Sequence, residues 1–149
     1  MNGTGPAADV PRFGTELAGV PVLLPAGAAL EFVPSAAVHP LPLAPRRVLG
    51  LMQLRGQPLV VVDPAREPVP ASAAQSLPVL VVGTPPEAAA LRVATAPRAL
   101  KLGAAQPSAA LPDCRFAPAL GAALSDASRS GGVWFEVDPA RLFAELMQD

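Results

Sequence analysis

The chain has 149 residues, and its 11 basic and 12 acidic side chains give a formal net charge of −1. This balance argues against a nucleic-acid-binding protein, because phosphate contacts need a basic face. Hydrophobic residues make up 51% of the chain, which suffices for the core of one domain and argues against wholesale disorder.

Proline and glycine set the expected length of the regular elements. The chain contains 20 prolines and 12 glycines. Frequent proline breaks helix interiors and avoids central strand positions, so long helices are largely excluded. The composition therefore predicts a small β protein with many turns.

Residues 1–12 are small and proline-bearing, show no hydrophobic periodicity, and are expected to form a flexible tail. From Phe13 onward, strand-sized apolar runs rich in Val and Leu alternate with turn residues. Seven such runs separated by turns favour a barrel architecture. The runs cover residues 19–24, 30–33, 48–54, 58–62, 77–82, 91–93 and 133–137.

The segments between the runs are expected to be turns and loops. Arg55-Gly56-Gln57 separates two apolar runs and predicts a hairpin. Three longer stretches of small or polar residues, 64–76, 103–113 and 124–132, are expected to be surface loops or poorly ordered insertions.

The C-terminal segment has the pattern of a short amphipathic helix. Asp138 is a favourable N-cap residue, and Pro139 suits the first helical position. Four apolar side chains then recur at helical spacing: Leu142, Phe143, Leu146 and Met147.

Residues that could perform catalysis or bind a metal are isolated in the sequence. The lone histidine, His39, has no ligand cluster around it and is expected to face solvent or pack. Arg115 next to the single cysteine, Cys114, could favour a thiolate, but no base is placed beside it. No phosphate-binding glycine motif is present either. We therefore expect no catalysis, no metal and no cofactor.

The sequence also favours a cytoplasmic protein. A single cysteine cannot form an intrachain disulfide, so nothing requires an oxidising compartment. The longest uncharged windows are too short to span a bilayer and contain prolines, so direct membrane insertion is not expected. The N-terminus lacks the basic start and apolar middle of a signal peptide.

Two further features each allow two interpretations. The segment from Pro42 to Arg47 matches a P-x-x-P-x-R polyproline ligand, but a rigid connector is favoured, with Arg46 and Arg47 at a solvated edge. In the last apolar run, Phe135 is expected to face the core. Trp134 points to the opposite side, where it either packs in the core or at an edge, or contributes to a partner surface. Packing is the favoured alternative.

A resemblance to a known family rests on the 41 residues from Leu23 to Asp63, which align without a gap. This stretch resembles the CheW-like domain of bacterial chemotaxis coupling proteins. The matching motifs are Leu24-Pro25, Ala29-Leu30-Glu31, the turn from Pro42 to Pro45, Gly50, Gln53-Leu54-Arg55-Gly56 and Val62-Asp63. A looser match extends over most of residues 13–147, so a CheW-like domain is expected over 13–149.

The resemblance implies a mainly β fold of two small, five-stranded, SH3-like barrels that pack together, with a groove between them and a short C-terminal helix. Members of the family act without catalysis. They bridge the cytoplasmic tip of chemoreceptors and the regulatory domain of the histidine kinase CheA. The implied function is a cytoplasmic adaptor, recruited to membrane-associated receptor arrays, in a flagellar, pilus-linked or other chemosensory pathway.

The resemblance also points to partner-binding residues. Glu31 stands at the position of the family's partner-binding glutamate, and its charge should point outward from an apolar strand. Arg55 at the hairpin tip could bind a partner carboxylate or carbonyls through its planar guanidinium. Alternatively, Arg55 braces its own barrel by bonding a loop carbonyl or Asp63. Gly56 would provide the positive φ of the turn.

Three positions depart from the family pattern: Gln53 replaces the usual Asn, Ala29 a larger aliphatic residue and Ala94 an Asp. These changes affect the expected choice of partner rather than the fold. Gln53 and Trp134 are further candidates for the partner surface. Two other functions stay open: a groove-binding small-molecule sensor or enzyme that uses Cys114 or His39, and a scaffold for a partner other than a kinase.

Overall fold

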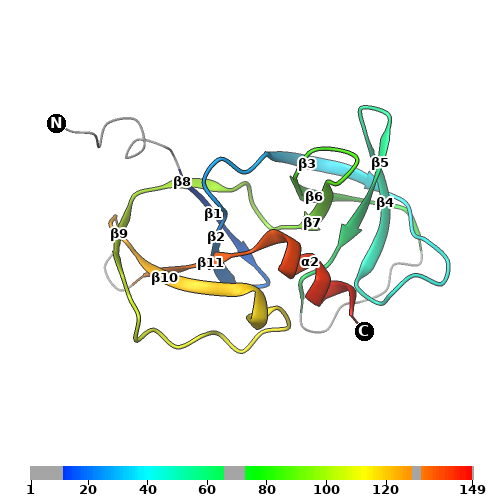
Figure 1. Ribbon diagram of the computed structural model, residues 1–149. Helices are drawn as coiled ribbons and strands as arrows, with labels where there is room; N and C mark the ends of the chain where they lie inside the picture. The colour runs from blue at the N-terminus through cyan, green and yellow to red at the C-terminus, as the bar shows by residue number, and fades with distance from the viewer. Residues whose placement is uncertain (1–11, 66–72, 129–131, 149) are drawn as a thin grey trace.

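Short strands dominate the computed structural model, which describes residues 12–65, 73–128 and 132–148. Within these ranges the chain is mainly β, with two curled, SH3-like sheets and a short C-terminal helix (Figure 1). The first strand begins at Arg12, the last residue of the expected tail, and the rest of that tail lies outside the described residues.

Barrel 1 is the sheet with the strand order β8-β1-β2-β11-β10-β9. Its strands β8 and β9 stand at opposite ends of this order, but only Lys101 separates them along the chain. The chain therefore bends at Lys101 and closes the barrel (Figure 1). The strands are β1 (Arg12–Leu17), β2 (Val20–Leu23), β8 (Arg98–Leu100), β9 (Leu102–Ala105), β10 (Leu120–Asp126) and β11 (Val133–Val137).

Barrel 2 is the sheet with the strand order β3-β6-β7-β5-β4. Its two edge strands meet just beyond β3, where His39 N–H donates to Leu51 O at 2.9 Å and Leu51 N–H donates to His39 O at 2.8 Å. This bridge closes the barrel at one end. The strands are β3 (Leu30–Val38), β4 (Val48–Leu54), β5 (Gln57–Val62), β6 (Gln75–Val82) and β7 (Ala89–Arg92).

The two barrels differ in how the chain builds them. Barrel 2 is one continuous segment from β3 to β7, residues 30–92. Barrel 1 combines the first two strands with four strands that follow barrel 2, and β2 pairs in parallel with β11, the last strand of the chain.

All seven apolar runs predicted from the sequence lie in or overlap strands, but four strands were missed: β1, β8, β9 and β10. Parts of the expected loops are strands, since β6 begins at Gln75, β9 runs to Ala105 and β10 ends at Asp126. Barrel 2 has the expected five strands. Barrel 1 has six segments because the bend at Lys101 divides one strand into β8 and β9.

The predicted C-terminal helix is confirmed as α2 (Pro139–Met147). Asp138 caps it, because its Oδ1 accepts hydrogen bonds from the N–H groups of Ala140 at 3.1 Å and Arg141 at 3.5 Å. Leu142 and Leu146 are fully buried in the main core, which is shared by both barrels and α2. This helix therefore holds the two barrels together by burying apolar surface.

Replacing Leu142 with Ala should lower the free energy of unfolding by about 2–5 kcal/mol, because the change leaves a cavity in the shared core. Urea denaturation followed by circular dichroism measures this loss. Met147→Ala is the matched control, since Met147 is 41% exposed at the end of the same helix, and its effect should stay within about 0.5 kcal/mol. Equal effects of the two changes would contradict the packing role of α2.

The interior of barrel 1 is organised around Trp134. Its Nε1–H donates to Asp126 Oδ2 at 3.2 Å, and the Arg98 guanidinium lies 5.4 Å from the ring centroid. A Cβ atom added at Gly14 would come within 2.8 Å of the indole. Because these contacts come from β1, β8 and β10, the indole on β11 lies inside the ring of strands. Trp134 is only 2% exposed, so it packs in a core and does not form an exposed contact.

The loop after β3 corrects one expectation and supports another. Leu43 has φ = 59°, which is incompatible with polyproline II, so the segment from Pro42 to Arg47 forms turns as the connector interpretation held. Arg46 is exposed as expected, but Arg47 is buried, and the prediction of a solvated Arg47 is wrong. Arg47 Nη1 donates to the carbonyl oxygens of Asp63 and Ala65, which follow the end of β5.

Candidate partner-binding site

The hairpin between β4 and β5 positions the first candidate residues. Arg55 has φ = 47° and Gly56 has φ = 83°, so both central residues of this two-residue turn have positive φ, as a type I′ turn requires. The expected positive φ at Gly56 is confirmed. The hairpin projects from barrel 2 and carries Arg55 at its exposed tip (Figure 1).

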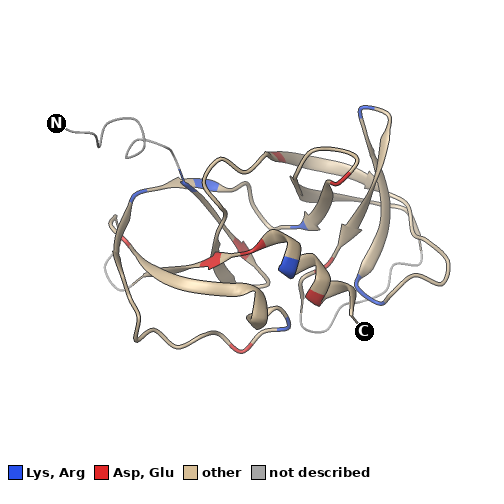
Figure 2. Cartoon of the chain, viewed as in Figure 1, with Lys and Arg blue, Asp and Glu red and all other residues tan. Residues whose placement is uncertain are grey.

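Arg55 forms a two-pronged ion pair with Glu31 on β3. Arg55 Nη2 donates to Glu31 Oε1 at 2.9 Å, and Nη1 donates to Oε2 at 3.1 Å. The two side chains remain 68% and 41% exposed. Arg55 therefore braces its own barrel, but through Glu31 rather than through a loop carbonyl or Asp63. Figure 2 shows a basic position at the tip of the hairpin and an acidic position at the start of β3.

The ion pair shifts the protonation equilibria of both groups. The hydrogen bond from Arg55 lowers the pKa of Glu31 from its ordinary value of 4.5, and the same bond raises the pKa of Arg55. Because the pKa of Glu31 is lower in the folded protein than in the unfolded chain, the ion pair stabilises the fold at pH values above the ordinary glutamate pKa. This stabilisation is lost as the pH falls through the lowered pKa of the folded protein. Because both groups are exposed, salt also weakens the pair.

A titration followed by carboxyl-carbon NMR should therefore place the pKa of Glu31 below 4.5 in the native protein. In Arg55→Gln, which lacks the guanidinium, the pKa should return toward the ordinary glutamate value. In the control variant Arg12→Gln, which removes the cation that contacts Glu136 on barrel 1 at 3.4 Å, the pKa of Glu31 should stay below its ordinary value. A pKa of Glu31 that does not respond to the loss of Arg55 would contradict the pair.

The other two candidates lie apart from each other. Gln53 is exposed on β4, two residues before Arg55, and so belongs to the same hairpin. Trp134 lies inside barrel 1 and is not part of this surface. We use the name hairpin rim for the partly exposed Glu31 and the exposed residues Gln53, Arg55 and Gly56.

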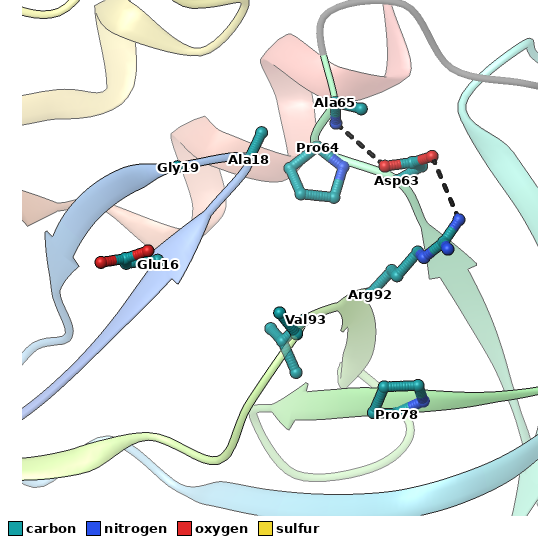
Figure 3. Close-up of a pocket in the computed structure, with 10 residues that line it drawn as sticks. Glu16, Ala18, Gly19, Asp63, Pro64, Ala65, Pro78, Arg92 and Val93 are labelled. Atoms are coloured by element: carbon teal, nitrogen blue, oxygen red, sulfur yellow. Dashed lines mark hydrogen bonds and ion pairs between the residues drawn. The ribbon is translucent and has the colours of Figure 1, made fainter.

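A groove of about 510 Å³ lies between the barrels, beside the β1–β2 turn. Its charged lining residues are Glu16, Asp63 and Arg92 (Figure 3). Asp63 is 6% exposed; its Oδ1 accepts from Ala65 N–H at 2.9 Å, and its Oδ2 lies 3.9 Å from Arg92 Nη1. Ala94, one of the departures from the family pattern, also lines this groove.

The residues considered for chemistry stand apart from this groove. His39 is exposed at the closure of barrel 2, and Cys114 is partly buried against the main core. Neither residue lines the groove. The described ranges contain no group of three or more His, Cys, Asp or Glu side chains that could hold a metal ion.

Two packed SH3-like barrels that share one core define the structural class of the protein as a double-barrel module. Comparison with family models identifies the CheW-like domain over residues 13–147. The chain belongs to the CheW-like domain family, and the resemblance deduced from its sequence is confirmed.

A solved structure with a similar fold is that of the scaffolding protein TtCheW from Thermoanaerobacter tengcongensis. The two chains share 15% sequence identity, and the match covers 86% of this chain and 88% of that chain with a TM-score of 0.58. A comparison with curated protein sequences gave no match. Among the described residues, no helix has the length and apolar character of a membrane span.

Proposed function

We propose that this protein is a cytoplasmic, non-catalytic adaptor that couples the cytoplasmic tip of chemoreceptors to the regulatory domain of a CheA-type histidine kinase. Its recruitment to membrane-associated receptor arrays follows from these contacts. Membership of the CheW-like family over residues 13–147 supports this proposal.

The observation that carries the proposal is the ion pair on the hairpin rim. The sequence analysis proposed Glu31 and Arg55 as two separate candidates for partner binding. In the structure they form one ion pair at the surface of barrel 2. A planar guanidinium fixed by a carboxylate keeps further N–H donors available, and exposed carboxylate oxygens keep acceptor capacity. Such a unit can form directed hydrogen bonds with a protein partner at little cost in side-chain entropy.

The direct test is calorimetry of the purified protein with the regulatory domain of the kinase and, separately, with a receptor tip fragment. Both should bind with dissociation constants between roughly micromolar and millimolar, equivalent to about 4–8 kcal/mol. Absence of binding to both partners at ~1 mM protein, the weak end of this range, would contradict the coupling function.

Substitutions on the hairpin rim should separate binding from folding. Arg55→Ala and Glu31→Lys should weaken partner binding, while the melting temperature stays within a few degrees, because exposed changes usually cost less than about 0.5 kcal/mol. Lys101→Ala, at the exposed bend of barrel 1, removes one basic charge as Arg55→Ala does and should leave binding unchanged. A large loss of stability in Arg55→Ala would instead assign this residue to the fold.

A further inference from the structure

A cavity of about 550 Å³ opens on barrel 1, where the chain arrives from barrel 2. Its lining comes from β1, from β8 and the segment that precedes β8, and from Trp134 on β11. This volume is in the usual range for sites that bind small molecules. We use the name β1–β8 cavity for it. The lining residues with polar or charged side chains are Thr15, Glu16, Thr95 and Arg98.

The strand register places the carboxylate of Glu16 and the guanidinium of Arg98 on one face of the sheet. Arg98 stands opposite Gly14 in the antiparallel ladder between β1 and β8. Side chains two residues apart on a strand point to the same face, so Glu16 lies diagonal to Arg98. Diagonal neighbours in a sheet are about 7–8 Å apart. An acid and a base therefore border the same cavity at a separation that a small molecule can span.

The guanidinium of Arg98 is held by an aromatic ring rather than by an acidic side chain. It lies 5.4 Å from the centroid of the Trp134 ring, which is within cation–π distance. Gly14 permits this arrangement, because a Cβ atom at that position would come within 2.8 Å of the ring. The ion pairs of the described ranges include neither Arg98 nor Glu16. Both charged groups thus keep hydrogen-bonding capacity for solvent or for a ligand.

A molecule that carries a carboxylate and an ammonium group close together complements this pair of charges. The planar guanidinium of Arg98 binds a carboxylate through two parallel hydrogen bonds, and its stacking on Trp134 lowers the entropy lost on binding. The carboxylate of Glu16 accepts hydrogen bonds from an ammonium group, and the hydroxyl of Thr95 can donate or accept. We propose that the β1–β8 cavity binds a small zwitterion of the α-amino-acid class, with its carboxylate on Arg98 and its ammonium group on Glu16.

This inference goes beyond the proposed function and does not depend on it, because no partner protein takes part in the binding. The test is an NMR titration of the ¹⁵N-labelled protein that follows the amides of Gly14, Glu16 and Arg98 and the indole N–H of Trp134, the single tryptophan. The probes are L-alanine, L-serine and L-leucine. Each is compared with the two analogues that lack its ammonium group or its carboxylate, which are propionate and ethylamine for L-alanine.

At least one of the three amino acids should bind with a dissociation constant of about 1 mM or below. Its two analogues should bind about tenfold more weakly or worse, since each lacks one charge-assisted contact. If none of the three amino acids shifts these resonances at ~10 mM, about ten times the expected dissociation constant, the proposal is overturned. Equal binding of an analogue would overturn it as well, because the cavity would then recognise a single charge.

Substitutions at the two charged positions test the assigned contacts. Arg98→Gln and Glu16→Gln each remove one charge and should weaken amino-acid binding about tenfold or more. Arg98→Lys keeps the charge without the planar fork and should also weaken it. The control Lys101→Gln removes a cation at the exposed bend outside the cavity and should leave binding unchanged. All these positions are exposed, and circular dichroism verifies folding. Unchanged binding in Arg98→Gln or in Glu16→Gln would overturn the proposal.

Discussion

Replacing Gly50 with Ala is expected to cause the largest loss of stability among the changes considered. Gly50 has φ = 148°, and a Cβ atom there would lie 2.0 Å from the carbonyl oxygen of His39. That oxygen accepts the hydrogen bond from Leu51 that closes barrel 2, so it cannot move away without breaking the bridge. Backbone strain and loss of closure together should cost about 4 kcal/mol or more.

Denaturation followed by circular dichroism gives the free energy of unfolding, and Gly27→Ala provides the matched control. Gly27 also has a positive φ, 77°, but a Cβ atom there meets nothing within 4 Å. This control should show the strain alone, about 1–2 kcal/mol. Losses of equal size at the two glycines would show that the contact with His39 is not what makes Gly50 necessary.

The second large effect is expected for Trp134→Ala. Trp134 is the single tryptophan of the chain and the largest side chain inside barrel 1. Its removal should cost about 3–5 kcal/mol, because the surrounding strands cannot collapse fully into the vacated space. Circular dichroism is again the suitable measurement, since the substitution removes the tryptophan fluorescence.

Trp134→Phe separates the two roles of this side chain. Phenylalanine retains an aromatic ring in the barrel but offers no N–H to the buried carboxylate of Asp126. The expected loss is smaller, about 1–3 kcal/mol, the usual cost of leaving a buried acceptor without its donor. A loss below 1 kcal/mol for Trp134→Ala, small against these packing costs, would show that barrel 1 does not depend on its tryptophan.

The strands that could be predicted are those with a strong local signal. Runs rich in Val and Leu, such as β5 and β6, combine high β-propensity with burial. The sequences of β9 and β10, Leu-Gly-Ala-Ala and Leu-Gly-Ala-Ala-Leu-Ser-Asp, carry small residues that have low β-propensity. These segments form strands because their neighbours in the closed barrel supply hydrogen-bond partners, and this tertiary effect leaves no trace in local composition.

In the candidate site, too, local features could be predicted from the sequence, whereas contacts between distant segments could not. The turn residues Arg55 and Gly56 could be predicted because the hairpin is local. The bond between Arg55 and Glu31 spans 24 positions and depends on where the hairpin projects relative to β3. Burial of Arg47 likewise depends on carbonyl groups 16 and 18 residues away. No periodicity or motif in the sequence reports such distances.

The path of the chain through the two barrels also orders their assembly during synthesis. All strands of barrel 2 have been made once residue 92 is available, and they need no later segment for their pairing. The sheet of barrel 1 cannot be completed before β11 has been made, because β11 is the strand that pairs with β2 on the side opposite β1. On the ribosome, the first two strands therefore leave the exit tunnel long before their sheet can close. Until β11 has been made, their apolar side chains depend on contact with the folded barrel 2 to be covered from water.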